Sequence, residues 1–151
     1  MQSTGQPTGT TTLDPIKFEV IRSALTVTTE EMAAVLRRSA YSTNIKTRQD
    51  FSCAFLDSEL RVVAQAFTQP VHLGSFVELI PRAVRNYGVE NMGPGDMILV
   101  NDPHSGGTHL NDITLIAPAY YPGDPGGRPV GYLATLAHHV DVGGGAPASL
   151  G

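Results

Sequence analysis

Glycine and proline are concentrated in the second half of this chain, and their placement limits what that half can form. The 16 glycines and 11 prolines make up about 18% of the 151 residues. Both residue types interrupt long helices and central strands. We therefore expect short strands joined by loops in this half of the chain.

Residues 15–40 are predicted to form one long amphipathic helix. Asp14 is a favourable N-cap and Pro15 a favourable first helical residue. Apolar residues recur near helical spacing along the segment: Ile16, Ile21, Leu25, Met32 and Leu36. A second helix is predicted over 76–87, preceded by a loop at 70–75. Pro81 is placed in its first turn, because proline disrupts the interior of a helix.

Short apolar segments separated by turn-forming residues predict the strands: 50–56, 60–66, 96–101, 113–119 and 131–138. The first two read as a β-hairpin, and 96–101 as a buried strand. Short loops between consecutive strands favour antiparallel pairing. The expected fold class is mixed α/β (α+β), with the long N-terminal helix packed on a mixed, largely antiparallel sheet. Residues 1–13 are expected to be a disordered tail.

Composition excludes several classes of function. The 14 acidic and 10 basic residues give a net charge of -4, which gives no general attraction for nucleic acid. No apolar run reaches the roughly 18 residues that a membrane span needs. The single cysteine, Cys53, cannot form an internal disulfide and fits a reducing, cytoplasmic location. It lies in a predicted strand and is interpreted as a core residue.

Histidine and aspartate gather where predicted strands begin and end. Four of the five histidines lie between residues 104 and 139, with aspartates beside them. His109 and Asp112 differ by three, so they converge only if the backbone turns between them. In an extended segment His138 faces one side and His139 the other, so at most one of them points into a given site. His and Asp side chains together bind divalent zinc, manganese or iron, and we predict a metal or acid–base site here.

Other polar residues have two interpretations each. His72 is either a structural residue or part of the site, and His104 either caps the turn after Asp102 or binds a ligand. Arg48 lies in a polar segment between a predicted helix and a strand. The segment is either a solvated linker or a means for Arg48 to bind a carboxylate with two parallel hydrogen bonds.

Several segments, taken in order, resemble the amino-terminal part of the hydantoinase B / 5-oxoprolinase / acetone carboxylase alpha-subunit family. The two most specific are Asn101-Asp102-Pro103-His104-Ser105-Gly106-Gly107-Thr108-His109-Leu110-Asn111-Asp112 and Ala137-His138-His139-Val140-Asp141-Val142-Gly143-Gly144. Weaker matches run from Asp14-Pro15 through Asp50-Phe51-Ser52-Cys53-Ala54 and Pro70-Val71-His72-Leu73-Gly74-Ser75. The resemblance covers nearly all of residues 14–151.

The resemblance implies ATP-dependent hydrolysis of a cyclic amide, of the hydantoin or 5-oxoproline type. This chain would be the N-terminal portion of the B-type catalytic subunit, 14–151. Its partner would be a hydantoinase A-type subunit that binds ATP, in a cytoplasmic hetero-oligomer. Family B-type subunits are several times longer, so we expect this chain to be inactive in isolation. The alternatives are the alpha-subunit portion of an ATP-dependent ketone carboxylase, and a non-catalytic fragment that only binds the A-type partner.

The resemblance also implies roles for individual residues. The metal ligands are predicted to be His109, Asp112 and His138, although which of His138 and His139 binds the metal is left open. The metal is manganese, zinc or iron. Catalytic roles are assigned to Asp102, His139 and Asp141. Substrate-binding roles are assigned to Arg48, His72 and His104.

Overall fold

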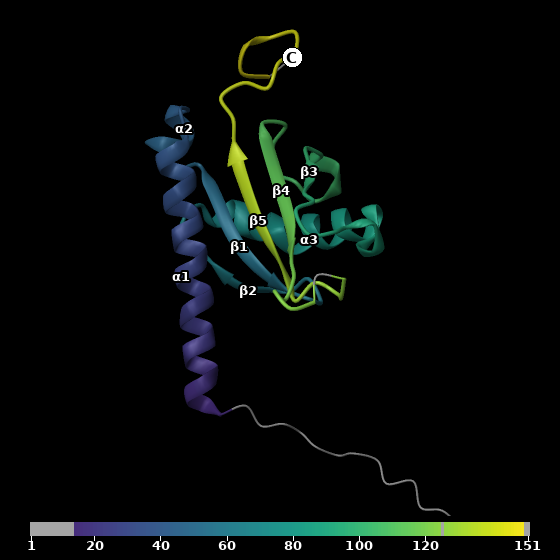
Figure 1. Cartoon of the computed structure of the whole chain (residues 1–151). Coiled ribbons are helices and arrows are strands. Elements are labelled where there is room, and N and C mark those ends of the chain that lie inside the picture. Colours follow the sequence, from purple (N-terminus) through teal and green to yellow (C-terminus); the bar gives the residue numbers. More distant parts are fainter. Residues whose placement is uncertain (1–13, 125, 150–151) are drawn as a thin grey trace, which may run out of the picture.

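The computed structural model describes residues 14–124 and 126–149, so the tail expected at 1–13 lies outside the described residues. Five antiparallel strands form one sheet in the order β2-β1-β5-β4-β3. The strands are β1 (Phe51–Asp57), β2 (Val62–Gln65), β3 (Ile98–Val100), β4 (Asp112–Ala119) and β5 (Gly131–His138). The long helix α1 (Pro15–Ser39) and the helix α3 (Pro70–Tyr87) lie on opposite faces of this sheet (Figure 1). The expected mixed α/β class is confirmed.

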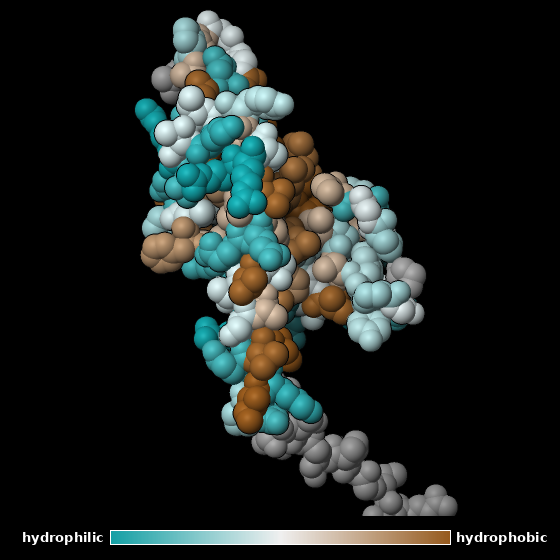
Figure 2. Space-filling model, turned by 60° about the vertical axis from the view of Figure 1, so that its left-hand side comes forward, coloured by the Kyte–Doolittle hydropathy of each residue, from teal (hydrophilic) through white to brown (hydrophobic). Residues whose placement is uncertain are grey.

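The predicted N-terminal helix is confirmed over Pro15–Ser39. The Asp14 carboxylate accepts a hydrogen bond from the backbone N–H of Ile16 (2.9 Å), which satisfies one free donor of the first turn. The C-terminal half of α1 packs on β1, where Ala33 joins an apolar cluster with Phe51 and Cys53. The N-terminal half extends beyond the sheet, and Figure 2 shows apolar residues exposed along it.

The loop predicted at 70–75 is wrong, because α3 begins at Pro70 and continues to Tyr87. Pro81 is in its interior and not in its first turn. Proline deprives the carbonyl of Val77, four residues earlier, of its helical donor. The Val77 side chain is exposed, so water can reach that side of the helix and supply the missing donor. The buried face of α3 outweighs the local preference of this segment.

That buried face of α3 forms the main core with one face of the sheet. Its members are Ala54, Leu56, Leu60, Phe76, Ile80, Val84, Met92, Ile116, Tyr132, Ala134 and Leu136. Strand residues in this core alternate along each strand, as the two-residue period requires. The residues in register with them therefore also face α3.

A strand forms within the predicted range 96–101, but the expectation that it is buried is wrong. Strand β3 has only three residues and lies at the edge of the sheet. Ile98 and Val100 are half-buried on the α3 side, but Leu99 is 63% exposed. Its neighbour in β4, Leu115, is also exposed. Helix α1 contacts β1 and β2, so it leaves this part of the opposite face uncovered.

Short helical turns complete the chain: α2 (Thr43–Lys46) and the 3₁₀ turns η1 (Val89–Asn91), η2 (Pro103–Ser105) and η3 (Pro147–Ser149). Helix α2 forms within the polar segment that was compatible with a solvated linker. Its residue Ile45 is buried in the cluster beneath α1. Among the described residues, no helix combines the length and apolar character needed to cross a membrane.

Replacing Gly131 with alanine is predicted to destabilise the sheet. A Cβ atom there would overlap the Leu56 carbonyl oxygen and the Phe55 ring on neighbouring β1. We expect Gly131→Ala to lower the free energy of unfolding by about 1–3 kcal/mol, the usual cost of overpacking. Gly126→Ala is the matched control, since no atom lies within 4 Å of its added carbon. Urea titration compares the two variants, and equal midpoints would contradict the β1–β5 register.

The Cys53 thiol is predicted to be unreactive in the folded chain. Burial, reinforced by the negative charge of Glu30, raises its pKa to about 12. A raised thiol pKa favours the protonated form, so at pH 8 only about one thiol in ten thousand is the reactive thiolate. A disulfide reagent should therefore label Cys53 only after denaturation. Rapid labelling of the native chain at pH 8 would show that α1 does not stay packed on β1.

Candidate metal centre

The register of the sheet places Asp112 and His138 side by side. They are directly opposite each other where β4 begins and β5 ends. Both lie on the α3 face, since they continue the alternation of Ile116 and Leu136. The His138 backbone N–H donates to the carbonyl oxygen of Asp50 (3.0 Å), just before β1. Asp50, His138 and Asp112 thus form a row across one end of the sheet.

A turn before β4 adds His109 to this row. The Asp112 N–H donates to the His109 carbonyl (3.2 Å), and the His109 N–H donates to the Asp112 carboxylate (2.9 Å). The His109 ring Nδ1 then lies 3.2 Å from the same carboxylate oxygen. Gly106 enters the turn at a φ of 100°, which glycine adopts without strain. The backbone turn that the three-residue spacing required is present.

The Asp112 carboxylate is at the centre of the cluster. Its side chain is only 3% exposed, and its second oxygen lies 2.8 Å from Nδ1 of His138. An ionised carboxylate only accepts hydrogen bonds, so this contact places a proton on Nδ1 of His138. In the neutral form of that ring, Nε2 is the nitrogen with a free lone pair. The His109 and His138 rings meet edge to face, 5.1 Å apart.

Helix α3 contributes His72 from its first turn. The residue is 1% exposed, and its Nε2 lies 3.7 Å from the Asp50 carboxylate. Burial lowers the pKa of His72, although the charges of Asp112 and Asp50 partly oppose this effect. Within the described part of the chain, Nδ1 of His72 has no hydrogen-bond partner. A buried neutral imidazole with an unsatisfied nitrogen is suited to bind a cation.

The donor set fits a divalent metal ion. One atom each from His72, His109 and Asp112 lie within 4.8 Å of one another. His138 contacts the same carboxylate from the other side. Imidazole nitrogens with a carboxylate oxygen are ligands typical of zinc, manganese or iron. The structure thus adds His72, considered earlier for substrate binding, to the neighbourhood of the predicted ligands.

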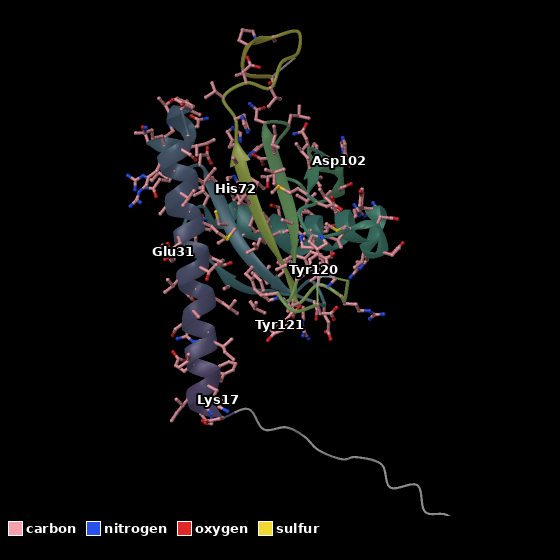
Figure 3. All side chains as sticks on the ribbon, in the orientation of Figure 1. Lys17, Glu31, His72, Asp102, Tyr120 and Tyr121 are labelled. Carbon is pink, nitrogen blue, oxygen red and sulfur yellow. The ribbon has the colours of Figure 1, made fainter. Side chains whose placement is uncertain are left out.

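Asp102 and His104 lie apart from this cluster. The Asp102 carboxylate accepts hydrogen bonds from the His104 N–H and the Ser105 hydroxyl, which lower its pKa. The His104 side chain is exposed, and its carbonyl accepts a hydrogen bond from Arg82 on α3. Asp102 is the N-cap of η2, and Figure 3 shows it well separated from His72. The turn is therefore capped by the Asp102 carboxylate, and His104, interpreted as the cap, takes part through its backbone N–H.

Asp141 organises the loop that follows β5. Its carboxylate accepts hydrogen bonds from the N–H groups of Gly143 and Ala148 and from the Ser149 hydroxyl, at 2.8–3.0 Å. These bonds lower its pKa. His139 lies next to His138, and its backbone is held by Asn111. Its N–H donates to the Asn111 carbonyl, and its own carbonyl accepts from the Asn111 side-chain amide.

Sequence reasoning missed two residues of this site, Asn111 and Asp50. The buried Asn111 amide donates to three carbonyls across the β5 end and the following loop, those of His139, Val140 and Ala148. Its position between His109 and Asp112 was the available signal. Asp50 gave none, because its contacts with His72 and His138 depend on the sheet register.

Comparisons with known proteins extend over nearly the whole described chain. The family model for hydantoinase B/oxoprolinase matches residues 14–151. An uncharacterized protein of Methanocaldococcus jannaschii is 48% identical over 140 residues, covering 91% of this chain and 24% of that protein. The 5-oxoprolinase of Saccharomyces cerevisiae is 39% identical over 138 residues, covering 91% of this chain and 10% of the yeast protein.

A solved structure shares the fold. The crystal structure of the ATP-dependent caprolactamase from Pseudomonas jessenii matches with a TM-score of 0.71 and 29% identity, covering 91% of this chain and 23% of that chain. The chain therefore spans about a quarter of the length of the archaeal relative and about a tenth of the yeast relative. The match to the family model, together with these relatives, shows that the chain belongs to the hydantoinase B/oxoprolinase family.

Proposed function

We propose that this chain is the N-terminal, metal-binding portion of a B-type subunit that hydrolyses a cyclic amide with ATP. The buried Asp112 carboxylate, shared by the rings of His109 and His138, is the observation that carries the proposal. Membership of the hydantoinase B/oxoprolinase family supports the cyclic amide as substrate. The similar yeast protein is named a 5-oxoprolinase, and the similar solved structure is that of an ATP-dependent caprolactamase.

In this proposal His109, Asp112 and His138 hold a divalent manganese, zinc or iron ion, with His72 as a further nitrogen donor. Such an ion polarises a carbonyl group and lowers the pKa of bound water. The chain's own residues set the geometry. The buried Asp112 carboxylate lies against both rings, and a metal ion held by Asp112 and Nδ1 of His138 would replace the proton that these two groups share. Burial lowers the pKa of His72, which favours the neutral ring that can bind a metal ion.

The three residues predicted to be catalytic differ in how well their positions suit proton transfer. His139 directly follows the cluster residue His138, but the two-residue alternation turns its side chain to the other face, so we assign it a supporting role through its backbone bonds to Asn111. Asp141 shapes the loop beside the cluster through its three hydrogen bonds. Asp102 shapes the turn η2. We therefore assign the two aspartates positioning roles around the site.

The ATP-dependent step is assigned to a partner. An amide is a weak electrophile, and phosphorylation of its oxygen creates a good leaving group. We assign ATP binding and this phosphorylation to an A-type subunit, which makes the functional unit a hetero-oligomer in the cytoplasm. The caprolactamase relative of this chain is itself named as a beta subunit, which supports a multi-subunit arrangement.

The purified chain is predicted to bind close to one divalent metal ion per molecule. Elemental mass spectrometry measures it in the wild type and in a His109→Ala, Asp112→Ala double variant. The variant should lose the metal, because two of the clustered donors are removed. His104→Ala is the matched control, since His104 is an exposed histidine of η2 outside the cluster. Circular dichroism checks that each variant is folded. A folded wild type without metal, or a double variant that keeps it, would contradict the proposal.

A second prediction concerns turnover. In a full-length B-type subunit carrying these residues, purified with its A-type partner, Asp112→Asn should reduce ring-opened product by more than about 100-fold. Loss of residues that merely support metal ligands already costs roughly 10- to 100-fold. The asparagine has nearly the same shape but no charge, so it separates electrostatics from packing. Chromatography of the ring-opened product provides the measurement, and unchanged turnover would rule out Asp112 as a site residue.

A further inference from the structure

We propose that the pocket beside the His/Asp cluster binds a negatively charged group of its ligand, and that Arg48 donates the hydrogen bonds to that group. The charged group is a carboxylate on the cyclic amide or a phosphoryl group on the activated amide. Carboxylate and phosphate both match the planar fork of an arginine. The inference rests on the proposed function, because it narrows the class of cyclic amide that this site takes.

The pocket connects Arg48 directly with the cluster. It has a volume of about 580 Å³, within the usual size of small-molecule sites. Arg48, Asn44, His109 and His138 all line it. The guanidinium and the imidazole rings of the cluster therefore border the same space.

Charge distinguishes Arg48 from the other residues around the pocket. Among the described residues that line the pocket, it is the one permanently charged side chain. The nearby Asp112 carboxylate does not line the pocket, because it is buried and contacts the two histidine rings. In the part of the chain that the structure describes, Arg48 forms no ion pair. Its guanidinium donors are therefore free for a ligand.

The backbone holds Arg48 in a fixed relation to the cluster. The Arg48 N–H donates to the Thr43 carbonyl (3.1 Å), and the Asp50 N–H donates to the Asn44 carbonyl (3.0 Å). Gln49 between them has a φ of 56°, a left-handed conformation that few residues other than glycine adopt. Strained conformations of this kind persist where the surroundings impose them, and they are concentrated at binding sites.

The other wall of the pocket suits the uncharged body of a ring. Leu110 and Val140 contribute apolar surface there. The Asn111 amide donates hydrogen bonds to the carbonyls of Val140 and Ala148. These bonds hold this part of the pocket lining in place beside the cluster. An apolar ring with one charged substituent matches the pocket, with the substituent at Arg48 and the ring amide near His109 and His138.

Binding measurements on the metal-loaded chain test the inference. By isothermal titration calorimetry, 5-oxoproline is compared with 2-pyrrolidinone, the same ring without the carboxylate, and with inorganic phosphate. We expect 5-oxoproline to bind at least about tenfold more tightly than 2-pyrrolidinone, the value of one good charge-assisted interaction. Arg48→Met should remove that preference. Arg48→Lys should retain only part of it, because lysine keeps the charge but lacks the planar fork.

Lys46→Met is the matched control. Lys46 is an exposed cation of α2 two residues from Arg48, but it does not line the pocket. Its removal should leave the preference intact. If 5-oxoproline shows no preference but phosphate binding depends on Arg48, the charged group is the phosphoryl group of the activated amide. If neither the preference nor phosphate binding depends on Arg48, the inference is overturned.

Metal content separates this result from the proposed function. Arg48→Met should bind as much metal as the wild type, since Arg48 is no part of the cluster. A chain that holds its metal but treats 5-oxoproline and 2-pyrrolidinone alike, with phosphate binding independent of Arg48, overturns the inference and leaves the proposed function standing. A chain without metal overturns the proposed function, while the phosphate titration still decides the role of Arg48.

Discussion

A buried carboxylate imposes strict demands on its surroundings, and Asp112 imposes them on two separate segments of this chain. An unpaired charge in the interior costs several kcal/mol, so the carboxylate must be surrounded by donors. The His109 N–H provides one, which requires the turn before β4. The His138 ring provides another, which requires the β4–β5 register. A shift of that register by one residue would move His138 to the other face of the sheet and leave Asp112 without it.

Helix α3 closes the same site from the opposite side because it begins earlier than its local sequence suggests. Packing of Phe76, Ile80 and Val84 against the sheet stabilises the helix as a whole. The first turn, Pro70 to Leu73, extends the helix over the end of the sheet and buries His72 there. The main core and the candidate site are therefore coupled, since the helix that fills one also supplies a nitrogen to the other.

Local patterns predicted the parts of the site that depend on neighbours in sequence. The three-residue spacing of His109 and Asp112 implied a turn, and the alternation along β5 implied that only one of His138 and His139 faces the cluster. Both are properties of the chain over a few residues. His72 and Asp50 could not be assigned in this way, because their proximity depends on the start of α3 and on the β1–β5 register. The interior position of Pro81 was missed because the wider packing of α3 outweighs the preference of one residue.

Very little of the chain sets the distance between Arg48 and the His/Asp cluster. Asp50 is two residues from Arg48, and its carbonyl accepts the His138 N–H directly. The left-handed conformation of Gln49 fixes the direction of the backbone between Asp50 and Arg48. A flexible linker would let the guanidinium bind ligands of many lengths. This short, hydrogen-bonded segment instead restricts the distance between the guanidinium and the cluster to a narrow range. Selectivity among cyclic amides would then follow from the backbone between α2 and β1, with the cluster itself providing the chemistry common to them.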